Sequence, residues 1–262
     1  MEADGRRRVA LITGGASGIG AATCVAFAER EFDVALCYRS RVSEAEAVAE
    51  ICSAAGANVL LIAADIAEDA DCRAAVAAVV ERFGGIDAVV NSAGATQFVP
   101  MADLEGITAT DFERVYRINT VGPFQLIRAA APALRARRGA VVNVSSVAGI
   151  VGNGSSMAYV ASKAALNALT LALARTLGPE IRVNAVLPGL VETDWVRRGV
   201  GDAAYGNVHD QWATSAALGK VATPEEVAAH IVFLAADAGL MTGQLMCIDA
   251  GFMLGRPAKV SR

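Results

Sequence analysis

The sequence predicts an α/β fold, with one doubly wound parallel sheet of about seven strands and helices on both of its faces. Three observations predict it. Short, continuously apolar runs alternate with amphipathic stretches of helix length, the pattern of a parallel sheet buried on both sides. A glycine-rich turn joins the first apolar run to the first helical stretch. No internal repeat, low-complexity segment or linker divides residues 1–262, so we expect a single domain.

The first half of the chain alternates regularly between the two kinds of segment. Four apolar runs are expected to form strands: Val9–Ile12, Asp33–Tyr38, Asn58–Ala63 and Ile86–Asn91. The stretches between them carry apolar residues at helical spacing and are expected to form helices: Ile19–Arg30, Ser43–Ala54 and Glu68–Phe83. Because a helix follows each strand, consecutive strands should run parallel.

The second half continues the alternation with two irregularities. A long helix is expected from about Thr110 to Arg137, and Pro123 and Pro132 should bend or interrupt it. Residues 190–219, which follow Pro188-Gly189, are expected to be irregular. The regular elements expected here are Ala140–Val144, Tyr159–Leu177, Ile181–Leu187, a helix capped by Thr223 that runs to Ala235, and Gln244–Ile248.

Composition and charge limit the classes of function. The chain is 54% hydrophobic and 19% charged, which is ample for a large core, and its formal net charge is −4. This charge gives no polyanion-binding signal, so we expect no nucleic-acid partner. The two histidines, His209 and His230, are far apart and have no thiols near them in sequence. We therefore expect neither a metal site nor a Ser-His-Asp triad.

Cysteines and apolar runs bear on where the protein is found. The five cysteines include no C-x-x-C pair, and an odd number without framework spacing is typical of buried, reduced thiols. The apolar run after the arginines at positions 6–8 ends at Thr13, too early for a signal peptide. No unbroken apolar run reaches the roughly 18 residues of a membrane span. We expect a soluble, cytoplasmic protein without a membrane partner.

The glycine-rich turn predicts a dinucleotide site. Gly14, Gly18 and Gly20 have the spacing G-x-x-x-G-x-G between the first strand and the first helix, and Ser17 and Ile19 complete the turn. Glycines let backbone N–H groups approach a pyrophosphate at a helix N-terminus, where the helix dipole favours anions. Strand, turn and helix together are typical of a Rossmann-type domain. Alone, the turn is weak evidence, because any tight turn between strand and helix can use glycine.

A tyrosine and a lysine form the candidate catalytic pair. Tyr159 and Lys163 lie four residues apart in a helix-favouring segment, so they should project from one helix face. Ser146 lies thirteen residues before Tyr159 at the end of an apolar run, and its neighbour Ser145 is expected to be structural. A hydroxyl, a phenol and an ammonium that converge can move a proton to or from a substrate oxygen. The pattern Tyr-x-x-x-Lys alone is common by chance, and its plain alternative is a packed tyrosine beside a solvated lysine.

With these motifs in this order, the sequence resembles the classical short-chain dehydrogenase/reductases over residues 9–253. The departure from the family is Ser92, where the family has asparagine; we expect altered local bonding without lost activity. The positions that match the family's cofactor-binding and catalytic segments are Gly14, Ser17, Gly18, Ile19, Gly20, Asp65 and Ile66 near the adenine, Asn91, Ala93, Gly94, the catalytic Asn119, and Pro188, Gly189, Val191 and Thr193 near the nicotinamide amide.

The resemblance implies an oxidoreductase that interconverts a carbonyl and a secondary alcohol. Tyr159 would exchange the proton, Ser146 would polarise the substrate oxygen, and Lys163 would also bond the nicotinamide ribose. Asn119 would position a water that links the lysine to solvent. Free tyrosine has a pKa of about 10, so we expect the Lys163 ammonium to lower the pKa of Tyr159 by about three units. No metal is required.

The end of the second strand predicts NADP(H) as the preferred cofactor. Family members that prefer NAD(H) usually carry an acidic residue there, whereas this chain has Tyr38 followed by Arg39 and Ser40. A guanidinium can bind a 2′-phosphate in bidentate fashion, and the Ser17 hydroxyl would add a donor. If Arg39 is only a solvated turn residue, NAD(H) is possible as well.

The substrate and assembly are less constrained. The sequence leaves 3-oxoacyl thioesters, small ketones and sugars or polyols open, and a catalytically silent dinucleotide-binding regulator or scaffold is the alternative function. Residues 190–219 follow the carboxyl end of a strand and are expected to form a substrate lid. The resemblance implies a homotetramer built through helices 110–137 and 157–177. Unless they face the chain's own core, the exposed positions of the second helix would be Ala164, Ala168, Leu171, Ala172 and Arg175.

Overall fold

The computed structural model describes residues 5–255 and confirms the predicted α/β fold. The sheet has seven strands in the order β3-β2-β1-β4-β5-β6-β7, and every neighbouring pair is parallel. Their bounds are β1 Arg8–Thr13, β2 Phe32–Tyr38, β3 Val59–Ala63, β4 Ala88–Asn91, β5 Ala140–Val144, β6 Arg182–Pro188 and β7 Leu245–Ile248.

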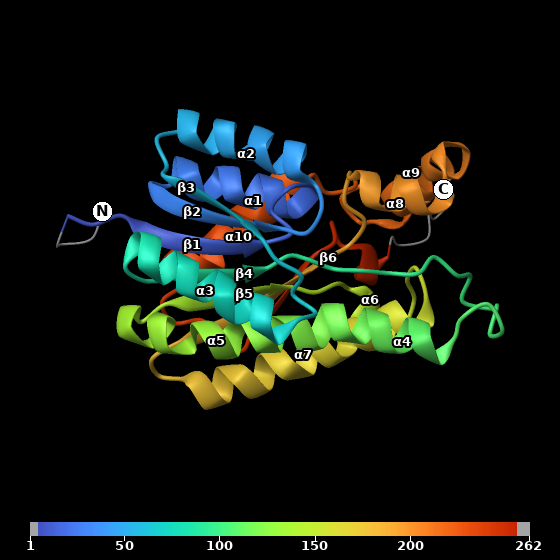
Figure 1. The fold of residues 1–262 in the computed structure, drawn as a ribbon. Coiled ribbons are helices and arrows are strands. Elements are labelled where there is room, and N and C mark those ends of the chain that lie inside the picture. Colours follow the sequence, from blue (N-terminus) through green and yellow to red (C-terminus); the bar gives the residue numbers. More distant parts are fainter. Residues whose placement is uncertain (1–4, 256–262) are drawn as a thin grey trace.

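Helices cover both faces of the sheet (Figure 1). One layer contains α1 (Gly18–Glu29), α2 (Val42–Ala54) and α10 (Pro224–Val232), and α1 packs directly on both of the others. The opposite layer contains α3 (Asp69–Phe83), α4 (Ala109–Tyr116), α5 (Gly122–Arg137) and α7 (Met157–Leu177). The shorter α6 (Ala148–Val151), which the sequence did not predict, follows β5 and packs on α7.

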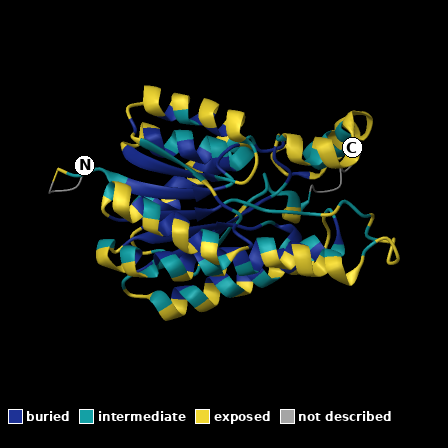
Figure 2. Ribbon diagram, viewed as in Figure 1, coloured by how far each residue is buried: buried dark blue, intermediate teal, exposed yellow. Residues whose placement is uncertain are grey.

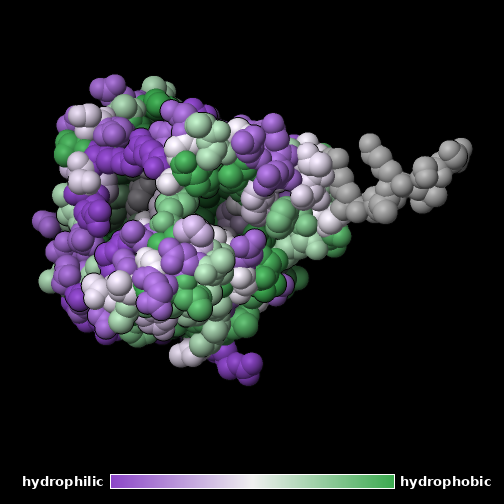
Figure 3. All heavy atoms as spheres, turned by 90° about the vertical axis from the view of Figure 1, so that its right-hand side faces the viewer, coloured by the Kyte–Doolittle hydropathy of each residue, from purple (hydrophilic) through white to green (hydrophobic). Residues whose placement is uncertain are grey.

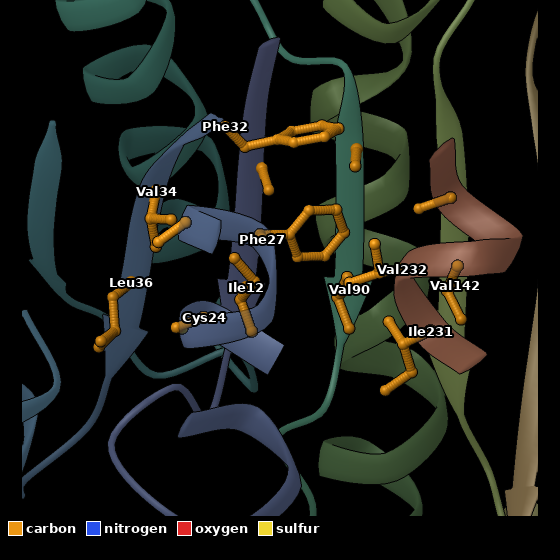
Figure 4. Close-up of a cluster of buried hydrophobic side chains, with 14 of the residues drawn as sticks. Ile12, Cys24, Phe27, Phe32, Val34, Leu36, Val90, Val142, Ile231 and Val232 are labelled. Atoms are coloured by element: carbon orange, nitrogen blue, oxygen red, sulfur yellow. The ribbon is translucent and has the colours of Figure 1, made fainter. Parts of the chain in front are cut away.

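The two cores follow from the alternation of side chains along the strands. In β1, Ala10 and Ile12 belong to the core beneath α1 and α10, whereas Val9 and Leu11 belong to the core beneath α3 and α5. Figure 4 shows the first core, in which Phe27 of α1 points toward the sheet. The inner strands of the sheet are buried along almost all of their length, the edge strands β3 and β7 are only partly covered, and the outer helix faces are exposed (Figure 2).

The predicted long helix is continuous but changes geometry once. A π-helical turn, Arg117–Val121, joins α4 to α5 immediately before Pro123, so the predicted interruption falls near this proline. Pro132 lies inside α5 without ending it. A π-turn inserts one extra residue into the helix and redirects the side chains that it carries. Here it carries Asn119, a predicted site residue.

The prediction that residues 190–219 are irregular is wrong. They contain two helices, α8 (Asp194–Val200) and α9 (Asp202–Ser215), separated by Gly201 at φ 82°. The Thr193 side chain caps α8 by accepting a hydrogen bond from the backbone of Trp195. Neither helix has a buried residue, so neither carries the apolar periodicity from which a helix is predicted.

The prediction for the cysteines is confirmed for four of them. Cys24, Cys37, Cys52 and Cys72 are buried free thiols, and burial raises the pKa of each. Cys247 is exposed, contrary to expectation, because it lies on the edge strand β7, whose residues are only partly covered.

Helix α7 is the one helix of the described chain that is long and apolar enough to cross a membrane by length and composition alone. It packs against α4, α6 and β6, and its inner face buries polar side chains, among them Ser162, Asn167 and Thr170. The apolar composition of α7 is therefore also that of a central helix packed against other elements of the domain.

Candidate active site

A cleft of ≈ 2180 Å³ opens at the carboxyl ends of the strands and gathers most of the predicted site residues. Figure 3 views this end of the molecule and shows a hollow bordered by both hydrophilic and hydrophobic residues. Three predicted residues, Gly20, Asn91 and Asn119, do not line the cleft but lie behind it. The predicted residues that do line it are Gly14, Ser17, Gly18, Ile19, Arg39, Ser40, Asp65, Ile66, Ala93, Gly94, Ser146, Tyr159, Lys163, Pro188, Gly189, Val191 and Thr193.

The glycine turn between β1 and α1 has the form of a dinucleotide site. Gly14 has φ 67°, and a Cβ there would lie 2.9 Å from Cα of Ala93. A Cβ on Gly20 would lie 2.2 Å from the carbonyl oxygen of Gly14, so the start of α1 folds tightly back on the turn. Ser17, the N-cap of α1, makes no side-chain capping bond, and the first turn of the helix borders the cleft. Uncapped N–H groups at a helix N-terminus suit a pyrophosphate, so these residues fit a dinucleotide.

Asn91 supports the sheet behind the site. Its amide donates to Oδ1 of Asn143 at 2.8 Å, and the Asn143 amide donates to Oγ1 of Thr170 in α7 at 2.9 Å. All three side chains are buried, so the chain of bonds ties β4, β5 and α7 together. At the departure from the family pattern, the backbone N–H of Ser92 donates to Thr13 Oγ1 at 3.1 Å. This contact does not depend on the side chain at position 92.

The serine, tyrosine and lysine converge as predicted. The Ser146 hydroxyl lies close enough to the Tyr159 phenol to lower its pKa, and both side chains line the cleft. Lys163, one helical turn after Tyr159, places its ammonium 5.7 Å from the centre of the tyrosine ring and donates to the carbonyl of Val144 at 2.8 Å. Ser145 points away from this group, because its hydroxyl bonds with Oδ1 of Asn167 at 2.6 Å. The arrangement favours Ser146 over Ser145 as the serine that meets substrate.

The expected lowering of the Tyr159 pKa does not occur in the protein alone. Burial raises the pKa of Tyr159 above its ordinary value, and the neighbouring Ser146 hydroxyl opposes the rise only in part. Burial also lowers the pKa of Lys163 to about 8. The ammonium bonds Val144 and lies beside the ring rather than on the hydroxyl, which explains its weak effect on the phenol. A phenol that keeps its proton near neutral pH is able to donate it.

The hydrogen bonds of the Asn119 side chain link two segments beside the site. Its amide donates to the carbonyl of Ala95 and to Oγ of Ser162, both at 2.9 Å, and its Oδ1 accepts from the backbone of Ala95 at 2.7 Å. Ser162 in turn donates to the carbonyl of Tyr159 at 2.7 Å. The side chain is fully buried and both amide hydrogens are used. Asn119 therefore holds the loop after β4 against the helix that carries Tyr159.

The structure adds residues that the sequence did not assign to the site. Phe98, Ser155 and His209 line the cleft, as do both tryptophans. Of the two, Trp195 is 40% exposed at the cleft. For His209 and the tryptophans the available signal was a cluster of aromatic residues in segment 190–219, which did not indicate which of them face inward. For Phe98 and Ser155 the sequence contained no signal.

The fold and the site define the class of protein, and comparison with known proteins agrees. A Rossmann-type sheet with a glycine turn and a Ser, Tyr and Lys group at its carboxyl edge is the frame of an NAD(P)-dependent oxidoreductase. The family described as enoyl-(acyl carrier protein) reductase matches residues 14–253. The chain belongs to the short-chain dehydrogenase/reductase family.

The names of individual relatives refer to different substrates. One relative is a Streptomyces violaceoruber protein provisionally named ketoacyl reductase 2 of the granaticin polyketide synthase. It is 37% identical to this chain, and the match covers 93% of this chain and 95% of the relative. L-fucose dehydrogenase of Mus musculus is 33% identical over 97% of this chain and 92% of its own. The structure of levodione reductase matches with a TM-score of 0.87 and 32% identity, covering 94% of this chain and 97% of that one.

Proposed function

We propose that the protein is an NADP(H)-preferring oxidoreductase that reduces a carbonyl to a secondary alcohol or catalyses the reverse reaction. The observation that carries this proposal is the convergence of Ser146, Tyr159 and Lys163 in the same cleft as the glycine turn. When bound, NADP(H) supplies or accepts the hydride. Gly14, Ser17 and the first turn of α1 would hold its pyrophosphate.

The protein's own groups account for the proton. Ser146 Oγ accepts the backbone N–H of Ala148 at 3.1 Å, which leaves its hydrogen free to bond a substrate oxygen. Tyr159 donates its proton to that oxygen in reduction and takes it back in oxidation. The nearby positive charge of Lys163 stabilises the phenolate that remains. The expected role of Asn119 in positioning a water stays a prediction.

The substrate class is tested by a panel. The relatives include a ketoacyl reductase, a sugar dehydrogenase and levodione reductase, so all three classes left open by the sequence have precedents among similar proteins. A panel of 3-oxoacyl thioesters, small ketones and sugars or polyols, followed by the absorbance of the reduced cofactor, should identify one class that turns over. A catalytically silent regulator would bind the cofactor and turn over none of them.

Arg39 supports the preference for NADP(H). It lines the cleft just after β2, its side chain is 65% exposed, and its guanidinium is 3.8 Å from Oδ2 of Asp65. A loosely paired guanidinium is free to bind a 2′-phosphate instead. The residue before it, Tyr38, brings no carboxylate that would repel phosphate.

Arg39→Asp is expected to invert or abolish the cofactor preference, because it replaces an attractive charge with one that repels the 2′-phosphate. The ratio of kcat/KM for NADPH to kcat/KM for NADH measures the effect. In the unaltered protein this ratio should fall as salt rises, since the contact is an exposed charge pair. Arg82→Asp in α3, outside the cleft, is the control and should leave the ratio unchanged. Equal efficiency with both cofactors at low salt would contradict the assignment.

The outer face of α7 supports a homotetramer. All five positions predicted to be exposed on this helix are exposed, so the alternative that they face the chain's own core is excluded. They are Ala164, Ala168, Leu171, Ala172 and Arg175. Phe112, Tyr116 and Phe124 on α4 and α5 are also exposed. Small and aromatic side chains permit close contact between helices of neighbouring subunits.

Light scattering at micromolar concentration is expected to give the mass of a tetramer. Ala168→Arg should shift the protein toward smaller species, because it places a long charged side chain on the small-residue face of α7. Glu50→Arg on α2, an exposed position on the opposite layer, is the control and should stay tetrameric. A monomer from the unaltered protein would overturn the proposal.

Residues 190–219 support a substrate lid. Both of their helices border the cleft and neither has a buried residue, which is typical of segments that open at low cost in free energy. Trp195 faces the cleft, and Trp212 stacks on Phe252 with ring centres 3.7 Å apart.

The cytoplasmic location expected from the sequence stays a prediction.

A further inference from the structure

The substrate end of the cleft is bounded by two segments that contact each other. One is the loop that follows β4, and the other is α8. The Phe98 ring of the loop lies directly on Gly199 of α8. A Cβ added at Gly199 would lie 2.1 Å from Cε2 of that ring and 2.3 Å from both Cδ2 and Cζ. Only a residue without a side chain allows the two segments to approach this closely.

The loop side of this contact is held in place. Oγ1 of Thr96 and Oγ of Ser155 are hydrogen-bonded at 2.6 Å, and the backbone N–H of Val99 donates to the carbonyl of Ser155 at 2.9 Å. Ser155 lies just before the helix that carries Tyr159. Phe98 is thus fixed between two residues that are tied to the catalytic helix.

The α8 side has little to hold it. The helix buries none of its residues, and its ion pairs join Arg198 to Asp194 within the helix at 2.9 Å and Arg197 to Asp202 of the equally exposed α9 at 3.8 Å. Trp195 and Gly199 lie four residues apart and therefore share one face. Trp195 extends over Gly94, with Cη2 of its indole 3.8 Å from the position of a Cβ there. This face of α8 therefore contacts the loop after β4 at two places. In one, Gly199 of α8 meets Phe98 of the loop, and in the other, Trp195 of α8 meets Gly94 of the loop.

We propose that Phe98 seated on Gly199 is the closing contact of α8, and that it makes this end of the site selective for compact carbonyl substrates. With the contact made, the ring bridges α8 and the loop after β4 at the border of the cleft, where it would block a passage between them. A compact ketone fits behind it, whereas a substrate with a long chain holds the passage open. The inference rests on the proposed carbonyl reduction and specifies the substrate class for that site.

Gly199→Ala tests the proposal, because the added methyl group occupies the place of the ring and keeps α8 open. Gly206→Ala in α9 is the matched control, since a Cβ there meets nothing within 4 Å. Both glycines have ordinary helical backbones, so alanine favours the helix in each. For a compact cyclic ketone, kcat/KM should fall at least about tenfold in Gly199→Ala. For a long-chain 3-oxoacyl thioester it should be unchanged, and Gly206→Ala should match the unaltered protein with both.

Limited trypsin digestion gives a readout that needs no turnover. Cleavage after Arg197 and Arg198 should be faster in Gly199→Ala and in Phe98→Ala than in Gly206→Ala, with NADPH present in each case. In a Phe98→Ala background the further change Gly199→Ala should have little effect, since the two residues act through one contact. Equal digestion and equal substrate ratios in Gly199→Ala and Gly206→Ala would overturn the inference. Failure of the proposed reaction would instead appear as no turnover by the unaltered protein, with the digestion result still decisive.

Discussion

Tyr159→Phe is expected to lower kcat by at least about 100-fold, the lower range for a positioned acid or base, while cofactor affinity stays unchanged. The phenol lies beside Ser146 in the cleft, and phenylalanine keeps the ring but removes the proton. Burial raises the pKa of Tyr159, so in the unaltered protein the proton is present near neutral pH. Initial rates with the substrate found in the panel, together with cofactor binding followed by fluorescence, measure both quantities.

The control is Tyr116→Phe, which makes the same change on an exposed tyrosine at the end of α4. It should leave turnover and binding as they are. Near-normal turnover of Tyr159→Phe would show that the proton comes from another group, and the mechanism proposed for this site would be wrong.

Lys163→Met is expected to damage both turnover and cofactor affinity. Methionine retains an apolar stem but removes the ammonium, which stabilises the phenolate and is assigned to the nicotinamide ribose. The carbonyl of Val144, which accepts from Lys163 at 2.8 Å, also loses its side-chain partner. We expect kcat to fall by at least about 100-fold, as for Tyr159, and the cofactor dissociation constant to rise. Loss of turnover with unchanged affinity would remove the assigned second role of the lysine.

The pH dependence supplies an independent check on the lysine. Burial lowers the pKa of Lys163 to about 8, so its charge is present below that pH and is lost as the pH rises through it. Since kcat/KM reports groups of the free enzyme, its value for carbonyl reduction should decline above pH about 8. Lys163→Arg keeps its charge at alkaline pH and should therefore shift the decline in kcat/KM to higher pH, even if the rate itself is lower. A decline at the same pH in this variant would assign it to another group.

The sequence was sufficient to predict the architecture and to place the candidate catalytic residues. The alternation of apolar runs with helical stretches predicted the parallel sheet, since strands buried on both faces leave little choice of residue. The four-residue spacing of Tyr159 and Lys163 placed both on the inner face of α7, and the strand end at Val144 placed Ser146 beside them. These are local relations of period and order, which a sequence carries directly.

Features that depend on packing without periodicity were not predictable. The helices α8 and α9 bury no residue and show no apolar pattern, so the segment was expected to be irregular. The raised pKa of Tyr159 depends on burial and on the direction in which Lys163 points, toward Val144. The niche at Gly199 exists only because a loop from a distant part of the chain brings Phe98 to it. Sequence spacing contains none of these relations.

The central claim is that this cleft transfers hydride between NADP(H) and a carbonyl substrate. Its most direct test uses reduced cofactor that carries deuterium at the transferring carbon, with mass spectrometry of the alcohol product. One deuterium per product molecule is expected from the unaltered protein, and formation of that product should be at least about 100-fold slower with Tyr159→Phe. A protein that binds the cofactor but forms no deuterated alcohol from any member of the panel would contradict it, and would favour a dinucleotide-binding regulator.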